Sequence, residues 1–220
     1  MANETTLIIN ETFLSIQGES TYAGLPCFFI RLAGCNLNCF YCDTTYAKKT
    51  QDGKAVAITK LLELAEASDC RLVLITGGEP MLQSGVSKLC SALINKQFQV
   101  LIETNGSVAL NNLPKQVIKI MDIKGPSSGE AENFLLKNLN FLNSRDEIKF
   151  VIADRADFDY ALKLIKKHHL SEITNNILYS PSFGKIDPKE LASWMIEQLP
   201  PGRMQLQLHK YIWSTDTRGV

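Results

Sequence analysis

The stretch GCNLNCFYCDTTYA, residues 34–47, contains three cysteines, Cys35, Cys39 and Cys42, in a span of eight residues. A structural zinc site takes four ligands, and neither a second Cys-x-x-Cys pair nor a nearby histidine completes one here. A redox Cys-x-x-Cys pair would leave Cys35 without a role. A [4Fe–4S] cluster normally takes one thiolate per iron, so three thiolates would leave one iron free to bind a ligand and react.

The composition excludes several classes of protein. The chain has 220 residues, of which 45% are hydrophobic and 21% charged, and 23 basic side chains balance 23 acidic ones. No positive field for a nucleic acid is therefore expected. No run of 18 apolar residues predicts a membrane span, and the N-terminal MANETTLIIN lacks the features of a signal peptide. We therefore expect a cytoplasmic protein, whose six cysteines stay reduced rather than form disulfides.

Short apolar runs alternate with amphipathic stretches along the chain. Strands are predicted at residues 27–32, 71–76, 100–104, 117–123, 147–152 and 176–180, and helices at 59–67, 87–95, 157–168 and 188–199. Strands that alternate with helices and are apolar throughout are typical of a parallel sheet buried on both faces. The expected fold is α/β, with about six mostly parallel strands in a single domain over residues 1–220.

Polar loops follow the predicted strands directly. The cysteine loop follows the first strand, and Gly77-Gly78-Glu79-Pro80, Asn105-Gly106-Ser107, Lys124-Gly125-Pro126 and Pro181-Ser182-Phe183-Gly184 follow later ones. In β/α barrels the carboxyl ends of the strands carry the chemistry. These loops are therefore expected to meet at one edge of the sheet and to form the functional site there.

The spacing Cys35-x-x-x-Cys39-x-x-Cys42, with the aromatic Tyr41 before the last cysteine, resembles the radical S-adenosylmethionine (SAM) superfamily. The Gly77-Gly78-Glu79-Pro80 loop resembles the second SAM-contacting motif of that superfamily. The resemblance implies a partial TIM-type β/α barrel, the radical SAM core. It also implies a [4Fe–4S] cluster whose open iron holds SAM. One electron from the cluster would then release a 5′-deoxyadenosyl radical that abstracts hydrogen from the substrate.

Further phrases resemble the 7-carboxy-7-deazaguanine synthases of queuosine and 7-deazapurine biosynthesis. They are FLSIQGES, CDTTYA, LITGGEP, LIETNGS, MDIKGPSSGE, DEIKFVI and QLHKYIW, from about Phe13 to about Trp213. The resemblance implies a carbon–nitrogen lyase that converts 6-carboxy-5,6,7,8-tetrahydropterin to 7-carboxy-7-deazaguanine with loss of ammonia. SAM would act catalytically, and Mg²⁺ would assist. A cluster loop at 35–47 and a C-terminal strand and tail at about 203–220 are expected.

The same resemblance implies roles for individual residues. Cys35, Cys39 and Cys42 would bind the cluster, and Thr44 would place its hydroxyl on Mg²⁺, which prefers oxygen ligands. The implied SAM contacts are Tyr41, Cys42, Asp43, Gly78, Asp122, Ile123, Lys124, Ser180, Pro181, Ser182 and Phe183. The implied substrate contacts are Ile16, Gln17, Gly18, Arg31, Thr76, Glu103, His209 and Val220. Arg31 would meet the substrate carboxylate as a fork-like pair.

The chain departs from the family pattern at three places. Tyr41 replaces a common tryptophan, and Ser20 stands where a glycine usually ends the Gln-Gly-Glu-Gly phrase. Asp122-Ile123-Lys124 replaces the Ser-Pro-Lys of many members, which puts side-chain contacts there in doubt. Lys149, within EIKFVI, receives no role from the sequence.

Two other functions compete with this interpretation. An activating enzyme that installs a glycyl radical on a partner protein would share the cysteine motif, but Gln17 and the CDTT phrase favour a pterin pocket. A non-enzymatic iron–sulfur electron carrier would be expected to have a fourth cysteine ligand. The resemblance implies a homodimer and a reductant of flavodoxin or ferredoxin type, with no nucleic-acid or membrane partner. The sequence leaves open the electron donor, the dimer interface and the fate of the product.

Overall fold

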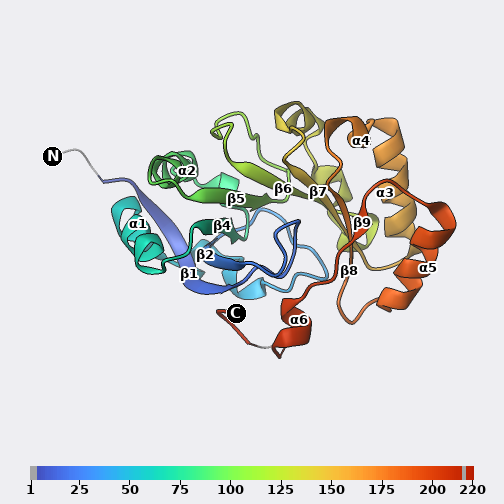
Figure 1. Ribbon diagram of the computed structural model, residues 1–220, viewed down its shortest axis with the longest axis horizontal. Coiled ribbons are helices and arrows are strands. Elements are labelled where there is room, and N and C mark those ends of the chain that lie inside the picture. Colours follow the sequence, from blue (N-terminus) through green and yellow to red (C-terminus); the bar gives the residue numbers. More distant parts are fainter. Residues whose placement is uncertain (1–3, 215–216) are drawn as a thin grey trace.

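A computed structural model describes residues 4–214 and 217–220 as a curved sheet with helices along its outer side (Figure 1). The sheet has nine strands in the order β3-β1-β2-β4-β5-β6-β7-β8-β9. The strands are β1 Thr6–Ile16, β2 Pro26–Leu32, β3 Lys54–Ala57, β4 Leu72–Gly77, β5 Gln99–Thr104, β6 Ile118–Ile123, β7 Glu147–Ile152, β8 Ile177–Pro181 and β9 Arg203–Met204. The helices are α1 Ile58–Ala67, α2 Val86–Asn95, α3 Arg155–Lys167, α4 Leu170–Ile173, α5 Pro188–Gln198 and α6 His209–Ile212.

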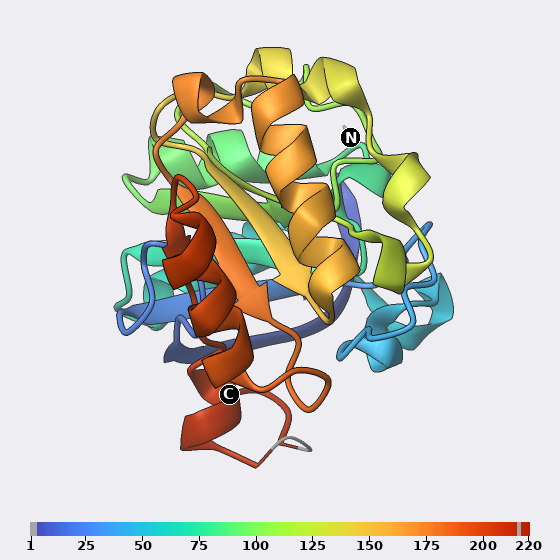
Figure 2. The same ribbon diagram turned by 90° about the vertical axis from the view of Figure 1, so that its right-hand side faces the viewer.

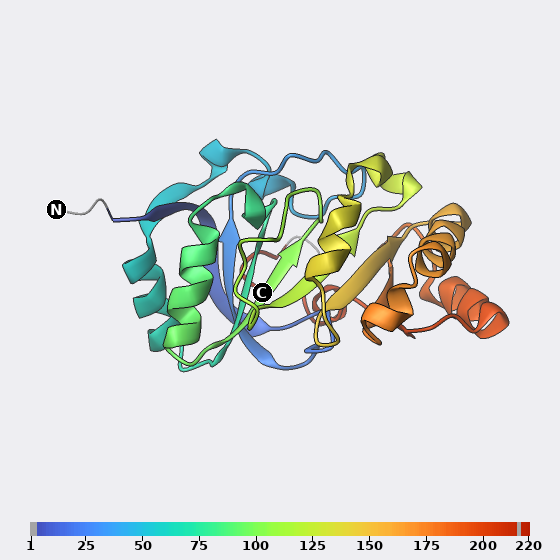
Figure 3. The ribbon, with the colours of Figure 1, turned by 90° about the horizontal axis from the view of Figure 1, so that it is seen from above.

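The sheet is an incomplete barrel. Successive strands are parallel along the order β2-β4-β5-β6-β7-β8-β9, whereas β1 is antiparallel to both β2 and β3. The two end strands, β3 and β9, do not pair with each other, so the sheet remains open. Seen from above, α1 and α2 cover one end of the curved sheet, and α3 to α5 cover the other (Figure 3). The predicted α/β fold of mostly parallel strands in a partial barrel is confirmed.

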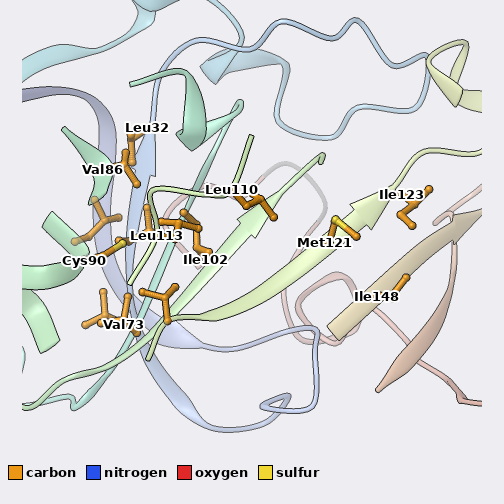
Figure 4. Close-up of a cluster of buried hydrophobic side chains, with 14 of the residues drawn as sticks. Leu32, Val73, Val86, Cys90, Ile102, Leu110, Leu113, Met121, Ile123 and Ile148 are labelled. Carbon is orange, nitrogen blue, oxygen red and sulfur yellow. The ribbon is translucent and has the colours of Figure 1, made fainter. Parts of the chain in front are cut away.

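Side chains on the two faces of the parallel strands enter two separate apolar layers. The outer layer packs under the helices, and Figure 4 shows Ile102 of the sheet on the side of Cys90 of α2, with Met121 further along the sheet. The smaller inner layer comprises Cys27, Phe29, Leu72, Leu74, Leu101, Ile118 and Ile120. Burial on both faces explains why these strands read as nearly continuous apolar runs.

Two of the connections between neighbouring parallel strands contain no α-helix. The segment between β5 and β6 and the one between β6 and β7 form turns and 3₁₀ segments instead. The fully buried Asn138 joins them, because its Nδ2 donates to the carbonyls of Gly106 (2.9 Å) and Val108 (2.8 Å) while its Oδ1 accepts from the Leu110 amide (3.1 Å). This amide satisfies backbone groups that a helix would otherwise have paired.

The six strands and four helices predicted from the sequence are all present, with boundaries within two residues of the prediction. Strands β1 and β3 were not predicted, and in the region of the C-terminal strand expected at about 203–220 the structure has only the short β9. The β1 sequence TLIINETFLSI does not alternate cleanly, because most of the strand is only half-buried. The other two strands are only four and two residues long. Within residues 4–214 and 217–220, no helix is both long enough and apolar enough to cross a membrane.

The departure at Ser20 has a conformational consequence that can be tested. Ser20 is buried and has a φ of 68°, in the left-handed region that glycine adopts without strain. Its Oγ accepts a hydrogen bond from the Tyr22 amide at 3.0 Å, which partly offsets the strain. We expect Ser20→Gly to change the free energy of unfolding by less than about 1 kcal/mol, and Ser20→Val to lower it by about 1–3 kcal/mol.

Anaerobic urea unfolding followed by circular dichroism measures both changes. Ser193→Val is the matched control, since Ser193 is exposed in α5 and should cost only about 0.5 kcal/mol of helix propensity. Equal stability of Ser20→Val and the parent chain would show that the conformation of Ser20 carries no strain.

Candidate active site

Five polar side chains from neighbouring strands form a ring inside the barrel, near the carboxyl ends of the strands. They are Arg31 of β2, Thr76 of β4, Glu103 of β5, Asp122 of β6 and Lys149 of β7, and all five line one cavity. Arg31 pairs in register with Thr76, and Asp122 with Lys149. The apolar Phe29 and Leu74 line the cavity from the inner layer. At about 580 Å³ the cavity is in the size range of small-molecule sites.

The cysteine loop leaves β2 and covers one side of this cavity, so that Cys35, Cys39 and Cys42 all line it. Its first residues are fixed by backbone bonds, from Gly34 N to Ala47 O and from Cys35 N to Lys48 O, both 2.8 Å. Gly78 lies directly against the loop, because a Cβ there would be 2.2 Å from the Gly34 carbonyl oxygen. The Gly-Gly pair is therefore needed for close backbone packing under the cysteines.

The thiol groups fit an iron–sulfur cluster. Burial raises the pKa of Cys35 and of Cys39, so a nearby cation is needed to stabilise their thiolates. In the described part of the chain, no three His, Cys, Asp or Glu side chains converge on the position of a single metal ion. A cluster does not require such convergence, because each thiolate binds a different iron.

Unpaired buried polar atoms mark the side of the cavity next to the cysteines. Among residues 4–214 and 217–220, four buried side-chain polar atoms have no hydrogen-bond partner: Tyr41 OH, Asp122 Oδ1, Ser180 Oγ and Ser15 Oγ. Tyr41 and Asp122 line the cavity, and Ser180 is at the end of β8, next to the cavity-lining Ser182. Buried polar atoms are normally paired, so these atoms fit a polar ligand such as SAM.

The segment after β6 places alternate side chains in the cavity. Lys124 Nζ lies 2.9 Å from Asp122 Oδ2. Burial alone would raise the pKa of Asp122, but Lys124 and Lys149 outweigh it and lower the pKa. The side chain of Ile123 points the other way, into the outer apolar layer (Figure 4). The side chain of Ile123 therefore faces away from the cavity, because neighbouring strand residues face opposite sides of the sheet, and the expected SAM contact at this position stays a prediction for its backbone.

The opposite side of the cavity comes from the loop between β1 and β2, which carries Gln17, Gly18 and Glu19. Glu147 anchors this loop, since its carboxylate accepts hydrogen bonds from the Thr21 amide (3.0 Å) and hydroxyl. Arg31 is held by Glu11, whose Oε1 accepts from its Nε at 2.8 Å. Because that bond uses the Nε edge, the terminal nitrogens of the guanidinium stay available for a carboxylate in the cavity.

The C-terminal segment lines the cavity through Gln207, His209, Lys210 and Val220, and Figure 2 shows its helix α6 beyond the end of β8. Leu208 N donates to the Gly18 carbonyl at 2.9 Å, and a Cβ on Gly18 would lie 2.2 Å from His209 Nδ1. Lys210 forms an ion pair with Asp43 at 3.0 Å. Burial would raise the pKa of Asp43, but Lys210 outweighs it and holds the pKa at about 2. The segment thus contacts both the β1–β2 loop and the cysteine loop.

Most of the site residues named from the sequence line this one cavity. The exceptions are Ile123, Ser180 and Pro181, which do not line it. Thr44 lines the cavity and donates to Asp43 Oδ1 at 2.9 Å. Of the remaining cysteines, Cys27 and Cys90 are buried, and Cys70 is half-buried.

Several polar cavity-lining residues received no role from the sequence, among them Glu19, Lys48, Lys149, Gln207 and Lys210. A signal was present for one of them, because a lysine inside the apolar run EIKFVI must either reach water or meet a carboxylate. The others lie in loops or, for Lys210, in the short helix α6, and their positions depend on distant parts of the chain.

Comparison with known proteins identifies the superfamily. The family model described as the radical SAM superfamily matches residues 29–195, most of the chain. The 7-carboxy-7-deazaguanine synthase of Chlorobaculum tepidum is 46% identical, with all of both chains covered. That of Koribacter versatilis is 40% identical over 96% of this chain and 99% of the relative. The chain belongs to the 7-carboxy-7-deazaguanine synthase family.

A solved structure supports the fold of this synthase family member. The crystal structure of QueE from Escherichia coli has a TM-score of 0.77, with 24% identity over 93% of this chain and 95% of that one. As a radical SAM enzyme, the synthase uses a [4Fe–4S] cluster and SAM, in agreement with the thiols and unpaired polar atoms described above. The relatives agree with the deazaguanine synthase interpretation rather than with a glycyl-radical activase or an electron carrier.

The buried Glu79 is expected to hold the Gly-Gly loop in place. Its carboxylate accepts from Met81 N (2.9 Å), Thr104 Oγ1 (2.8 Å) and Asn105 N (2.7 Å), which ties the end of β4 to the end of β5. Glu79→Ala would leave these donors unpaired, so we expect the free energy of unfolding to fall by about 2–4 kcal/mol.

Anaerobic urea unfolding of the apoprotein measures this loss. Glu66→Ala is the control, because the pair between Glu66 and Lys96 is exposed to solvent and should contribute less than about 1 kcal/mol. A Glu79 variant as stable as the Glu66 variant would contradict the structural role given to this carboxylate.

Proposed function

We propose that this synthase converts 6-carboxy-5,6,7,8-tetrahydropterin to 7-carboxy-7-deazaguanine with loss of ammonia, as a step of queuosine or 7-deazapurine biosynthesis. One observation carries the proposal. A single cavity has the three cysteines on one side and, on the other, a ring of polar side chains from Arg31 to Lys149. A polar, anionic ring system bound there would lie beside the cofactors, as hydrogen abstraction requires.

The cluster and SAM, when bound, supply the one-electron cleavage and the hydrogen-abstracting radical. The chain holds the cluster through Cys35, Cys39 and Cys42. The unpaired Tyr41 OH and Asp122 Oδ1 supply polar contacts for SAM, and Gly78 permits its close approach to the backbone. The protein thus contributes binding and orientation.

The substrate contacts follow from the chemistry of the ring. The free guanidinium nitrogens of Arg31 would pair with the substrate carboxylate. Gln17, Glu19 and Glu103 would meet the pterin nitrogens and amino group, because amide and carboxylate oxygens accept hydrogen bonds from N–H donors. His209 and the terminal Val220 line the cavity from the closing segment and would exclude water from it.

Mg²⁺ would bind at Thr44, with the substrate carboxylate as a second oxygen ligand. Thr44 is supported by its place in the cavity beside Asp43, which Lys210 keeps ionised at neutral pH against the opposing effect of burial. We further propose a cytoplasmic homodimer of single-domain chains, reduced by a flavodoxin- or ferredoxin-type protein. Cysteines that must stay reduced support the compartment.

An anaerobic turnover assay tests the reaction. Reconstituted, reduced enzyme with SAM, Mg²⁺ and 6-carboxy-5,6,7,8-tetrahydropterin should form 7-carboxy-7-deazaguanine, detected by mass spectrometry. Cys39→Ala is the control that should lose both the iron–sulfur absorbance and turnover. Cleavage of SAM without the deazaguanine product would refute the substrate while leaving the superfamily intact.

The metal site has a test of its own. Thr44→Val removes the hydroxyl but keeps the shape of the side chain, so Mg²⁺ should stimulate the variant much less than the parent. Thr45→Val, one residue further along the same loop, is the control. SAM affinity, measured by equilibrium binding, should be unchanged in both variants. An unaltered Mg²⁺ response in Thr44→Val would contradict the assignment.

A further inference from the structure

Lys149 lies at the centre of the site and has no role in the reaction as described so far. It extends from the middle of β7 into the barrel, where its side chain is only 4% exposed. Its Nζ forms ion pairs with Glu19 Oε2 at 2.7 Å, with Asp122 Oδ2 at 3.3 Å, and with Glu103 Oε1. The three carboxylates come from the β1–β2 loop, β5 and β6, so one ammonium group connects three separate elements.

These contacts exclude two roles for Lys149, a direct hydrogen bond to a ligand and general-base catalysis. An ammonium group has three N–H donors, and each faces one of the three carboxylates, so none is free for a ligand. Burial would lower the pKa of Lys149, but Asp122, Glu103 and Glu19 outweigh it and hold the pKa well above its usual value. Lys149 therefore stays protonated and cannot act as a general base.

In Glu19 and Glu103, the carboxylate oxygen that does not contact Lys149 is held by another side chain. Glu19 Oε1 accepts from Gln207 Nε2 at 2.7 Å, and Glu103 Oε2 accepts from Thr76 Oγ1 at 3.2 Å. Each carboxylate is thus held from two sides. Both line the cavity, so their remaining lone pairs can accept hydrogen bonds from a ligand there.

Three clustered carboxylates would repel each other without a cation between them. Burial would raise the pKa of Glu19, but Lys149 outweighs it and lowers the pKa. Removing the ammonium would leave the charges unpaired in a buried site, and at least one carboxyl group would then take up a proton near neutral pH. A protonated carboxyl presents an O–H donor to the cavity where an acceptor is needed.

We propose that Lys149 is a positioning residue for substrate binding, whose ammonium group fixes the carboxylates of Glu19 and Glu103 as acceptors for N–H groups of the pterin ring. The proposal rests on the substrate class proposed above and deepens it. It makes this wall of the cavity specific for a ring that presents several N–H donors, as the amino-pyrimidine part of a pterin does.

The test is the affinity for 6-carboxy-5,6,7,8-tetrahydropterin, measured anaerobically by isothermal titration with SAM bound and no reductant. Lys149→Met should weaken binding by roughly tenfold or more, because it leaves buried acceptors without their cation. Lys149→Arg keeps the charge and should recover part of the affinity. Iron content and SAM cleavage without substrate verify that each variant is folded and loaded.

The pH profile separates positioning from a merely structural role. Charged or titratable groups face Lys149 from each neighbouring element, and these are Glu19, Glu103, Asp122, Lys124, Glu147 and His209. Since Lys149 keeps Glu19 ionised and burial keeps the pKa of His209 below its usual value, parental affinity should be flat between about pH 6.5 and 8.5. In Lys149→Met the pKa of a carboxyl rises, so affinity should fall as the pH is lowered through that range.

Lys119→Met is the matched control. Lys119 is as buried as Lys149, and its Nζ lies 3.0 Å from Asp146 Oδ2. Neither Lys119 nor Asp146 lines the cavity. The control variant should reduce stability but leave the affinity profile flat. Parental affinity in Lys149→Met, or weaker affinity with a flat profile and no recovery in Lys149→Arg, would overturn the proposal. If the parent itself failed to bind the pterin, the proposed function would fall and this inference with it.

Discussion

A charge inside a sheet that is buried on both faces is stable only where an opposite charge meets it. This constraint governs the interior of the barrel. Apolar side chains such as Phe29 and Leu74 occupy the inner layer, and the buried Lys149 and Lys124 face three carboxylates between them. The polar ring and the apolar layer below it are therefore two parts of one arrangement.

The open sheet imposes a second requirement, because its interior must be covered where strands are missing. Two segments far apart in sequence provide the cover, the β1–β2 loop and the chain after β9. They contact each other through Leu208 and Gly18 and through Gln207 and Glu19. Both segments also carry residues proposed to contact the substrate. The hydrogen bonds that hold these two segments over the open side of the sheet therefore also position residues of the proposed binding site.

The sequence was informative where local pattern and tertiary environment agree. The parallel strands were predicted well because burial on both faces makes them apolar throughout, and the cysteine spacing with the Gly-Gly loop identified the superfamily. The prediction failed where position depends on distant contacts. Half-buried β1 lacks a clear period, so its sequence alone did not predict a strand. The partners of Lys149 are 130, 46 and 27 residues away, so no local pattern could reveal its role.

The helix-free connections after β5 and β6 affect how evenly the fold is stabilised. Side chains such as Asn138, and not a helical ladder, pair part of their backbone, so we expect these connections to open more readily than the helices and the paired strands. The cysteine loop is attached to the connection after β6, because Phe40 N donates to Ser128 O at 3.1 Å and Asn38 N to Glu130 Oε1 at 2.7 Å. Local opening of these connections would therefore loosen the cysteine loop while the strands stay paired. Amide exchange in the connections is thus expected to rise together with the accessibility of the thiols in the cysteine loop.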